Sequence, residues 1–329
     1  MSDKPTNEEF LQAADPMRRE LLAHCYRMMG SVHDAEDLVQ ETYLRAWRAY
    51  DGFEGRSSLR TWLYRIATTA CLTALDSRNR RPLPTGLGAP STEASAPLVQ
   101  DTEVPWLEPV PDAMAGVGAD DPASIVTSRE SIRLALIAAL QHLPPRQRAV
   151  LILRDVLKWR AAEVAEAVGS STAAVNSILQ RARAQLNEVS PSLDDPVEPL
   201  SREQRAQLDR YVAAFENYDI DSLVHLFTKD AVWEMPPFVG WYQGPDTIME
   251  LTRSHCPAER AGDLRLIPIG ANGQPSFAVY HRDGDVHRQF ALMVLTFTGD
   301  QISHVGMFFE QSLFETFGLP ATLEASAPK

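Results

Sequence analysis

The sequence predicts a multidomain chain with two all-α modules followed by a C-terminal α+β domain. Apolar residues recur at intervals of three and four over residues 8–80 and again over 128–188, as in amphipathic helices. A stretch rich in Pro, Ala and Gly over 82–122 interrupts this pattern. Beyond residue 200, two helix-like stretches precede five runs of β-forming residues, which turn signals such as Gly299-Asp300 separate.

Changes in composition set the boundaries of these modules. We divide the chain into helical residues 1–82, an acidic linker 83–127, helical residues 128–189, a short linker 190–200, an α+β domain 201–320 and a flexible tail 321–329. The first linker holds seven acidic and no basic residues. Such a segment is expected to bury too little apolar surface to order itself.

The charge of the chain is unevenly distributed. The formal net charge is −13, yet residues 129–188 carry +4, whereas residues 189–329 carry −10. Binding to nucleic acid requires a basic surface, so residues 129–188 are the candidate segment for it.

Several classes of protein and site are not expected. No apolar run reaches the roughly 18 residues of a membrane helix, and the N-terminus lacks a signal-peptide pattern. The three cysteines are scattered without a CxxC pair, which favours a reducing cytoplasm over structural zinc or a disulfide framework. We therefore expect a cytoplasmic protein that has no membrane segment, metal or cofactor.

Residues 160–186 predict a helix-turn-helix. A short helix at 160–167 leads into a turn at Gly169, and Ser170 or Ser171 can cap the second helix. Its apolar face would comprise Val175, Leu179, Ala182 and Leu186. The other side suits a DNA major groove because, apart from the small Ala173, it carries polar side chains and arginines. These candidate DNA-binding residues are Ser171, Thr172, Ala173, Asn176, Ser177, Gln180, Arg181 and Arg183. The same pattern also fits an amphipathic helical hairpin with a solvated outer face.

The first module contains a helix with one charged face. Over residues 34–48, this face carries Asp34, Asp37, Glu41, Arg45 and Arg48, and the apolar residues Val39, Tyr43, Ala46 and Trp47 lie on another face. For a lone helix, plain solvation of the charged face is the ordinary explanation. A second helical stretch ends in the basic cluster Arg78, Arg80 and Arg81, which suits DNA phosphates.

These motifs, in this order, resemble the extracytoplasmic-function group of the sigma-70 superfamily. DAEDLVQETYLRAW is similar to region 2.2 of that family, and SLRTWLYRIA with the following helix is similar to regions 2.3 and 2.4. LPPRQRAVLILRDVLKWRAAEVAEAVGSSTAAVNSILQRARAQL is similar to region 4. The resemblance covers residues 8–82 and 128–188.

The resemblance implies two partners, core RNA polymerase and promoter DNA. The β′ clamp helices would contact Asp34, Asp37, Gln40, Glu41 and Arg45, and the β flap would contact the second module. The minus-10 element would be melted and read by Arg60, Trp62, Arg65 and Thr69, with the basic cluster nearby. Helix 172–186 would read the minus-35 element, and the acidic linker would occupy the RNA-exit path. Thr69 replaces an Asn that is frequent in the family.

The third module resembles a different family. VAAFENYDIDSLVHLFTKDAVWEMPPFVGWYQGPDTIMEL is similar to the opening of SnoaL-like domains of the NTF2-like superfamily, which implies a cone with an apolar pocket. The candidate pocket residues are Trp233, Trp241, Tyr242 and His304, and Glu234 and His287 are further candidates. Strand alternation predicts that at most one of Trp233 and Glu234 points inward.

We therefore expect a sigma factor rather than an enzyme. Its acidic C-terminal domain is expected to contact the sigma modules and to regulate them, because it carries −10 against +4 on residues 129–188. Some NTF2-like domains are isomerases or hydrolases. The alternative is accordingly a SnoaL-like enzyme or ligand sensor whose helical half is an adaptor.

Overall fold

The computed structural model describes residues 7–77, 80–116, 131–189 and 200–324. The chain forms two compact units, one of residues 1–81 and 112–196 and the other of residues 82–111 and 197–329. Among the helices in the described ranges, none has both the length and the apolar character needed to cross a membrane.

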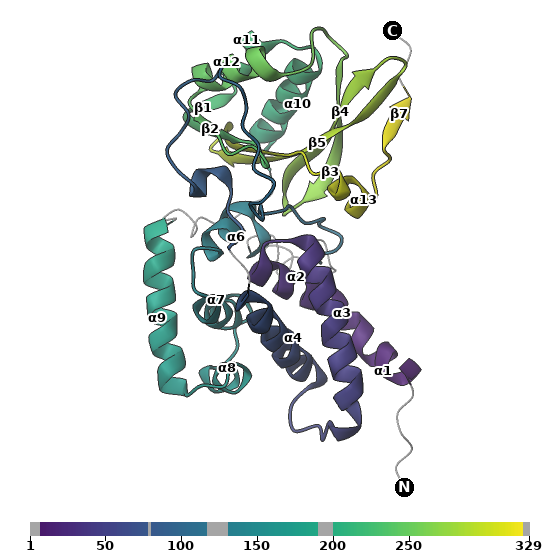
Figure 1. Cartoon of the computed structure of the whole chain (residues 1–329), viewed down its shortest axis with the longest axis vertical. Helices are drawn as coiled ribbons and strands as arrows, with labels where there is room; N and C mark the ends of the chain where they lie inside the picture. Colours follow the sequence, from purple (N-terminus) through teal and green to yellow (C-terminus); the bar gives the residue numbers. More distant parts are fainter. Residues whose placement is uncertain (1–6, 78–79, 117–130, 190–199, 325–329) are drawn as a thin grey trace. The chain divides into compact units, whose positions relative to one another are not determined.

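The first helical module is a small bundle (Figure 1). It contains α1 (Asn7–Ala14), α2 (Arg18–Met29), α3 (Val32–Ala49) and α4 (Leu59–Leu75), with 3-10 turns η1 (Asp15–Met17) and η2 (Tyr50–Gly52). Ser31 caps α3 by accepting the amide of Asp34, and Ser58 caps α4 in the same way. Leu21, Val39 and Leu63, from three different helices, have no exposed surface, so the bundle has its own core.

The second helical module contains the predicted helix-turn-helix. Its elements are α6 (Leu134–Leu140), α7 (Pro145–Leu151), η4 (Ile152–Val156), α8 (Ala161–Ala167) and α9 (Thr172–Val189). Gly169 adopts φ +61° in the turn between α8 and α9, a conformation that glycine adopts without strain. Val175, Leu179 and Ala182 are buried on the inner face of α9, as the helical periodicity predicted.

The C-terminal domain is the predicted α+β fold, a curved sheet flanked by helices (Figure 1). The strands are β1 (Phe227–Glu234), β2 (Trp241–Gln243), β3 (Leu264–Ala271), β4 (Gln274–Asp283), β5 (Val286–Thr298), β6 (Gln301–Phe308) and β7 (Thr322–Glu324). The helices are α10 (Arg202–Glu216), α11 (Ile220–Val224), α12 (Pro245–His255) and α13 (Ser312–Thr316), and η3 (Pro84–Gly86) is a 3-10 turn. The sheet order is β2-β1-β6-β5-β4-β3, with β1 parallel to β6 and the other pairs antiparallel.

Helices α10 and α12 pack on the sheet to form the core of this domain. Tyr211 and Ile248 belong to one buried cluster with Trp233, Val279 and Met293 of the strands. Strand β7 lies inside the segment 321–329, which we expected to be a flexible tail. It pairs antiparallel with β5, and this pairing satisfies its backbone groups.

Residues 82–111, which we call the strap, differ from the sequence expectation. They pack as part of the C-terminal unit, although their composition predicted a linker without order. Ala94, Leu107 and Val110 are buried. The physical reason is that the strap is held largely through its main chain, whose hydrogen-bonding groups do not depend on apolar side chains. Most of the remaining predicted linker, residues 117–127, lies outside the described residues.

Candidate polymerase and DNA-binding surfaces

The charged face of α3 is only partly open to solvent. Asp37 and Gln40 are exposed, and Glu41 pairs with Arg45 one turn later at 2.7 Å. Asp34 instead accepts from Arg81 at 2.7 Å, and both side chains are largely buried. Asp34, which we expected to contact polymerase, is therefore paired with Arg81, which we expected to contact DNA.

Helix α4 presents the residues expected to read the minus-10 element. Arg60 pairs with Glu20 at 2.6 Å, and its guanidinium lies 5.0 Å from the centre of the Tyr64 ring. Trp62 packs against Phe53 of the preceding loop, with ring centroids 4.9 Å apart. The Trp62 contact holds the loop against α4, and the Arg60 ion pair joins α4 to α2.

The same face of α4 lines a pocket that it shares with the second helical module. The pocket has a volume of about 890 Å³, and its lining includes Trp62, Arg65 and Thr69 from α4 together with Pro145 and Glu166. Arg65 forms an ion pair with Glu166 of α8 at 2.6 Å. In this arrangement three of the four candidate minus-10 residues, Trp62, Arg65 and Thr69, line a pocket shared with the second helical module.

Two buried arginines join the helical modules. Arg27 of α2 donates to the carbonyl and the hydroxyl of Ser131 at 2.9 and 2.6 Å. Arg148 of α7 donates to the carbonyl of Met28, in the last turn of α2, and to Oε1 of Gln141 at 2.7 Å. Burial lowers the pKa of Arg27 and of Arg148 to about 10. The junction therefore contains buried polar contacts, although Nε of Arg148 is buried without a hydrogen-bond partner.

The outer face of α9 is solvent-exposed. Asn176, Gln180 and Arg181 are all exposed. Ser171 is the cap of the helix, since its Oγ accepts the Ala174 amide at 3.2 Å. Asn176, Gln180 and Arg181 are therefore the three side chains at the centre of this face that can reach base edges or phosphates.

The other candidate DNA contacts already have protein partners or lie outside the described residues. The hydroxyl of Ser177 donates back to the Ala173 carbonyl at 3.2 Å. Arg183 donates twice to Asp155, at 2.6 and 2.9 Å. Arg80 lies 3.1 Å from Nδ1 of His142. Arg78 lies outside the described residues, whereas Thr172 and Ala173 are exposed at the start of α9.

Among the candidate pocket residues of the C-terminal domain, a buried carboxylate pairs with a partly exposed histidine. Glu234 is 1% exposed, and its Oε1 lies 2.6 Å from Nε2 of His304. Its other oxygen accepts the backbone amide of Thr85 in the strap at 3.0 Å. Trp233, on the opposite face of β1, is also buried. Trp233 belongs to the core cluster, so only one of the two side chains points into the core, as strand alternation predicted. Glu234 is nevertheless buried because the strap contacts the second face.

Trp241 and Tyr242 also lie against the strap. The indole nitrogen of Trp241 donates to the carbonyl of Gly88 at 2.9 Å, and the Trp241 carbonyl accepts the Ser91 amide at 2.7 Å. Tyr242 is 3% exposed, and burial raises the pKa of its phenol. The structure therefore places strap residues beside Glu234, Trp241 and Tyr242.

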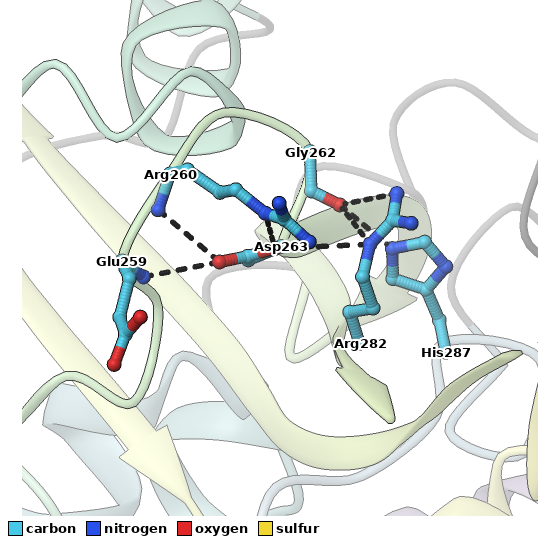
Figure 2. Close-up of polar contacts among 6 residues, drawn as sticks. All are labelled: Glu259, Arg260, Gly262, Asp263, Arg282 and His287. Atoms are coloured by element: carbon cyan, nitrogen blue, oxygen red, sulfur yellow. Dashed lines mark hydrogen bonds and ion pairs between the residues drawn. The ribbon is translucent and has the colours of Figure 1, made fainter. Parts of the chain in front are cut away.

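His287 belongs to a separate polar cluster (Figure 2). Its Nε2 donates to the Gly262 carbonyl at 2.9 Å, and Arg282 donates to the same oxygen. Asp263 accepts the amides of Glu259 and Arg260 at 3.1 Å. These bonds attach the loop before β3 to β4 and β5, which is a structural role. Within the described ranges, no group of histidine, cysteine and acidic side chains could hold a metal.

This architecture defines the class of protein, a sigma-70-type factor with an appended domain. The sequence matches the families described as Sigma-70 region 2 over residues 14–81, Sigma-70, region 4 over 133–186, and SnoaL-like domain over 208–309. The chain is 61% identical to the ECF RNA polymerase sigma factor SigG of Mycobacterium tuberculosis, over 96% of this chain and 85% of SigG. The chain belongs to the extracytoplasmic-function sigma factors.

Two further comparisons agree with this family. The ECF RNA polymerase sigma factor SigJ of Mycobacterium tuberculosis is 31% identical over 71% of this chain and 69% of SigJ. A crystal structure of Mycobacterium tuberculosis SigJ covers 94% of this chain and 100% of its own with a TM-score of 0.62 at 23% identity, which shows a shared fold. The resemblances drawn from the sequence, including the SnoaL-like one, are confirmed.

Proposed function

We propose that the chain binds core RNA polymerase in the cytoplasm and directs transcription from specific promoters. The observation that carries this proposal is the pairing of a region 2 bundle with a helix-turn-helix whose α9 presents Asn176, Gln180 and Arg181 to solvent. Membership of the sigma factor family supplies the general function, and these exposed residues supply the candidate readout of the minus-35 element.

Each surface has a proposed partner. Asp37, Gln40 and Glu41 with Arg45 would contact the β′ clamp helices, and region 4 would contact the β flap. Arg60, Trp62, Arg65 and Thr69 would contact the minus-10 element. Asp34 and Arg81 would act mainly by fixing one another, since their ion pair is largely buried.

The closed arrangement of the helical modules implies a conformational step. Arg65 is held by Glu166, and the pocket that Trp62 and Thr69 line is shared with α7 and α8. Binding of DNA to this face of α4 would have to break this ion pair and compete with α7 and α8 for the same side chains. We infer that the modules separate before the minus-10 element is engaged.

We assign the C-terminal domain a regulatory role. Its charge of −10 over residues 189–329 is opposite in sign to the +4 of residues 129–188, so a contact between them would compete with DNA. The second candidate role is ligand sensing, which the pair of buried Glu234 and partly exposed His304 favours. A catalytic role is less well supported, because the strap amide of Thr85 already occupies the second oxygen of Glu234.

Polymerase binding can be tested by reversing the charge on α3. Asp37→Arg with Glu41→Arg is expected to abolish co-elution with core polymerase, because two attractive contacts become repulsive. The control is Asp285→Arg, which makes the same kind of change in an exposed turn of the C-terminal domain. Circular dichroism should show unchanged helicity. Normal co-elution of the double variant would refute the α3 assignment.

A further inference from the structure

We propose that the C-terminal domain has a binding site for an extended peptide, and that the strap, residues 82–111 of the same chain, is its releasable ligand. The inference deepens the proposed regulatory function and rests on it for its consequence in transcription. The site is formed by the edge strand β2, the loop before it, the end of α12 and the turn between β3 and β4.

The contacts follow the strap along most of its length. Near its start, the Thr85 amide donates to Glu234, and the Gly88 carbonyl accepts from Trp241. In its middle, Val99 accepts the Val239 amide at 3.0 Å, and the Asp101 amide donates to Pro237 at 2.9 Å.

The end of the strap is held in the turn between β3 and β4. Asn272 donates its amide to the Val110 carbonyl at 3.1 Å and accepts the Val110 amide on its side chain at 3.0 Å. Asn272 is fully buried and has φ +53°. Most of the bonds along the strap use its main chain, which is how sheet edges bind extended peptides.

One small side chain anchors the centre of the strap. Ala94 has no exposed surface and belongs to the core cluster of the C-terminal domain. Its carbonyl accepts from Nε2 of His255 at 3.0 Å, and Leu98 packs at the margin of the same cluster. By contrast, Leu87 and Val99 are 46% and 63% exposed. The middle of the strap therefore has one small buried anchor beside exposed side chains, whereas its two ends are held by buried apolar residues such as Leu83, Leu107 and Val110.

Charge acts against the bound state. The strap holds four acidic and no basic residues, and residues 197–329 hold 18 acidic and 10 basic residues. The two therefore repel each other, and added salt should strengthen the hold of the strap by screening this repulsion. This dependence is opposite to that of an acidic domain docking on a basic module.

Capture of the strap has a direct consequence for the helical modules. The strap belongs to the segment that connects them, so its binding removes 30 residues from the free connection. An extended chain spans about 3.3–3.6 Å per residue, so release would lengthen the reach between the modules by up to about 100 Å. A ligand or partner that competes for the site would thereby increase the separation available to regions 2 and 4.

The test uses Ala94→Asp in the full chain, with Ser95→Asp as its matched control. Both variants add one carboxylate to the strap, but Ser95 is exposed, whereas Ala94 is buried. Hydrogen exchange is measured for peptides spanning residues 85–101 and for β4 and β5. Wild type and Ser95→Asp should protect residues 85–101, with stronger protection at higher salt. Ala94→Asp should lose this protection at least tenfold while β4 and β5 remain protected.

Two outcomes would overturn the proposal. The first is exchange of residues 85–101 at the free-chain rate in wild type, which would mean that no site holds them. The second is loss of protection in β4 and β5 of both Ala94→Asp and Trp241→Phe, a milder change that removes only the bond to Gly88. The strap would then be an integral part of the domain.

Measuring transcription by both variants with core polymerase distinguishes the existence of the peptide site from its proposed role in regulation. A several-fold difference between Ala94→Asp and Ser95→Asp supports both the site and the proposed regulation. Loss of strap protection with equal transcription supports the peptide site and overturns the regulatory function.

Discussion

At the residue scale, His24 shows how burial constrains one side chain of region 2. Its ring is fully buried, with Nε2 2.9 Å from Oγ1 of Thr68, and that hydroxyl donates to the Tyr64 carbonyl at 2.7 Å. Nε2 must therefore carry the proton. Nδ1 is buried and has no hydrogen-bond partner. Burial, with a contribution from Arg27, lowers the pKa of His24 to about 3.

This pKa predicts a stability that depends on pH. Between pH 6.5 and about 3 the unfolded chain binds a proton at His24 that the folded chain does not, so stability falls as pH decreases through this window. At pH 5 the loss relative to neutral pH is about 2 kcal/mol, since each pKa unit corresponds to about 1.4 kcal/mol. His24→Phe should lack this component. Urea unfolding of both proteins at pH 7 and 5 measures it, and equal pH dependence would contradict the assignment.

The ion pair of Arg65 and Glu166 gives a second prediction at this scale. Both side chains are at least a third exposed, so Glu166→Gln should change the free energy of unfolding by less than about 1 kcal/mol. It should maintain or increase promoter opening, because it releases Arg65. Arg65→Gln breaks the same pair but should decrease promoter opening.

Permanganate footprinting of the minus-10 element measures both variants. Equal effects on opening would show that the pair matters only as a contact between modules, and that Arg65 does not act on DNA.

At the scale of elements, α9 is a helix whose two faces have separate tasks. Arg181→Ala should weaken binding to all promoter sequences and reduce the salt slope by about one ion, because a phosphate contact is lost. Gln180→Ala should instead relax preference at one base pair by about 1–3 kcal/mol. Fluorescence anisotropy on a panel of minus-35 variants distinguishes the two effects. Unchanged binding by both variants would remove α9 from the DNA interface.

Element periodicity also shows where prediction from sequence succeeded. The inner face of α9 was predictable because a helix repeats every 3.6 residues and its burial follows that repeat. The pairing of Asp34 with Arg81 was not, because the partners are 47 residues apart and no local pattern relates them. The same holds for Arg27 and Arg148, which resemble surface arginines in the sequence but are buried.

At the scale of the whole molecule, the C-terminal domain can be tested by its removal. A chain ending at residue 195 lacks both the acidic domain and the surface that holds the strap. Its transcription with core polymerase should differ several-fold from that of the full chain. The part of this difference that arises from charge should fade as salt rises. Equal transcription at every salt concentration would leave the domain without a regulatory role and would favour ligand sensing.

Comparing transcription by the truncated chain with transcription by full-length Ala94→Asp separates the effect of the strap from that of the rest of the domain. If regulation acts through the strap, the truncated chain and the full-length variant should change transcription in the same direction. Opposite directions would indicate that the acidic surface acts on the sigma modules independently of the strap.

The sequence by itself determined the order of the modules, the helix-turn-helix and the family. These depend on local periodicity, turn residues and motifs that are read along the chain. Only the tertiary structure decided the position of the strap, because its hydrogen bonds come from main-chain groups that every sequence possesses. The main-chain groups of the strap are bound by the buried Glu234 and by Trp241 at the sheet edge. These two residues lie more than 130 positions further along the chain than their partners in the strap.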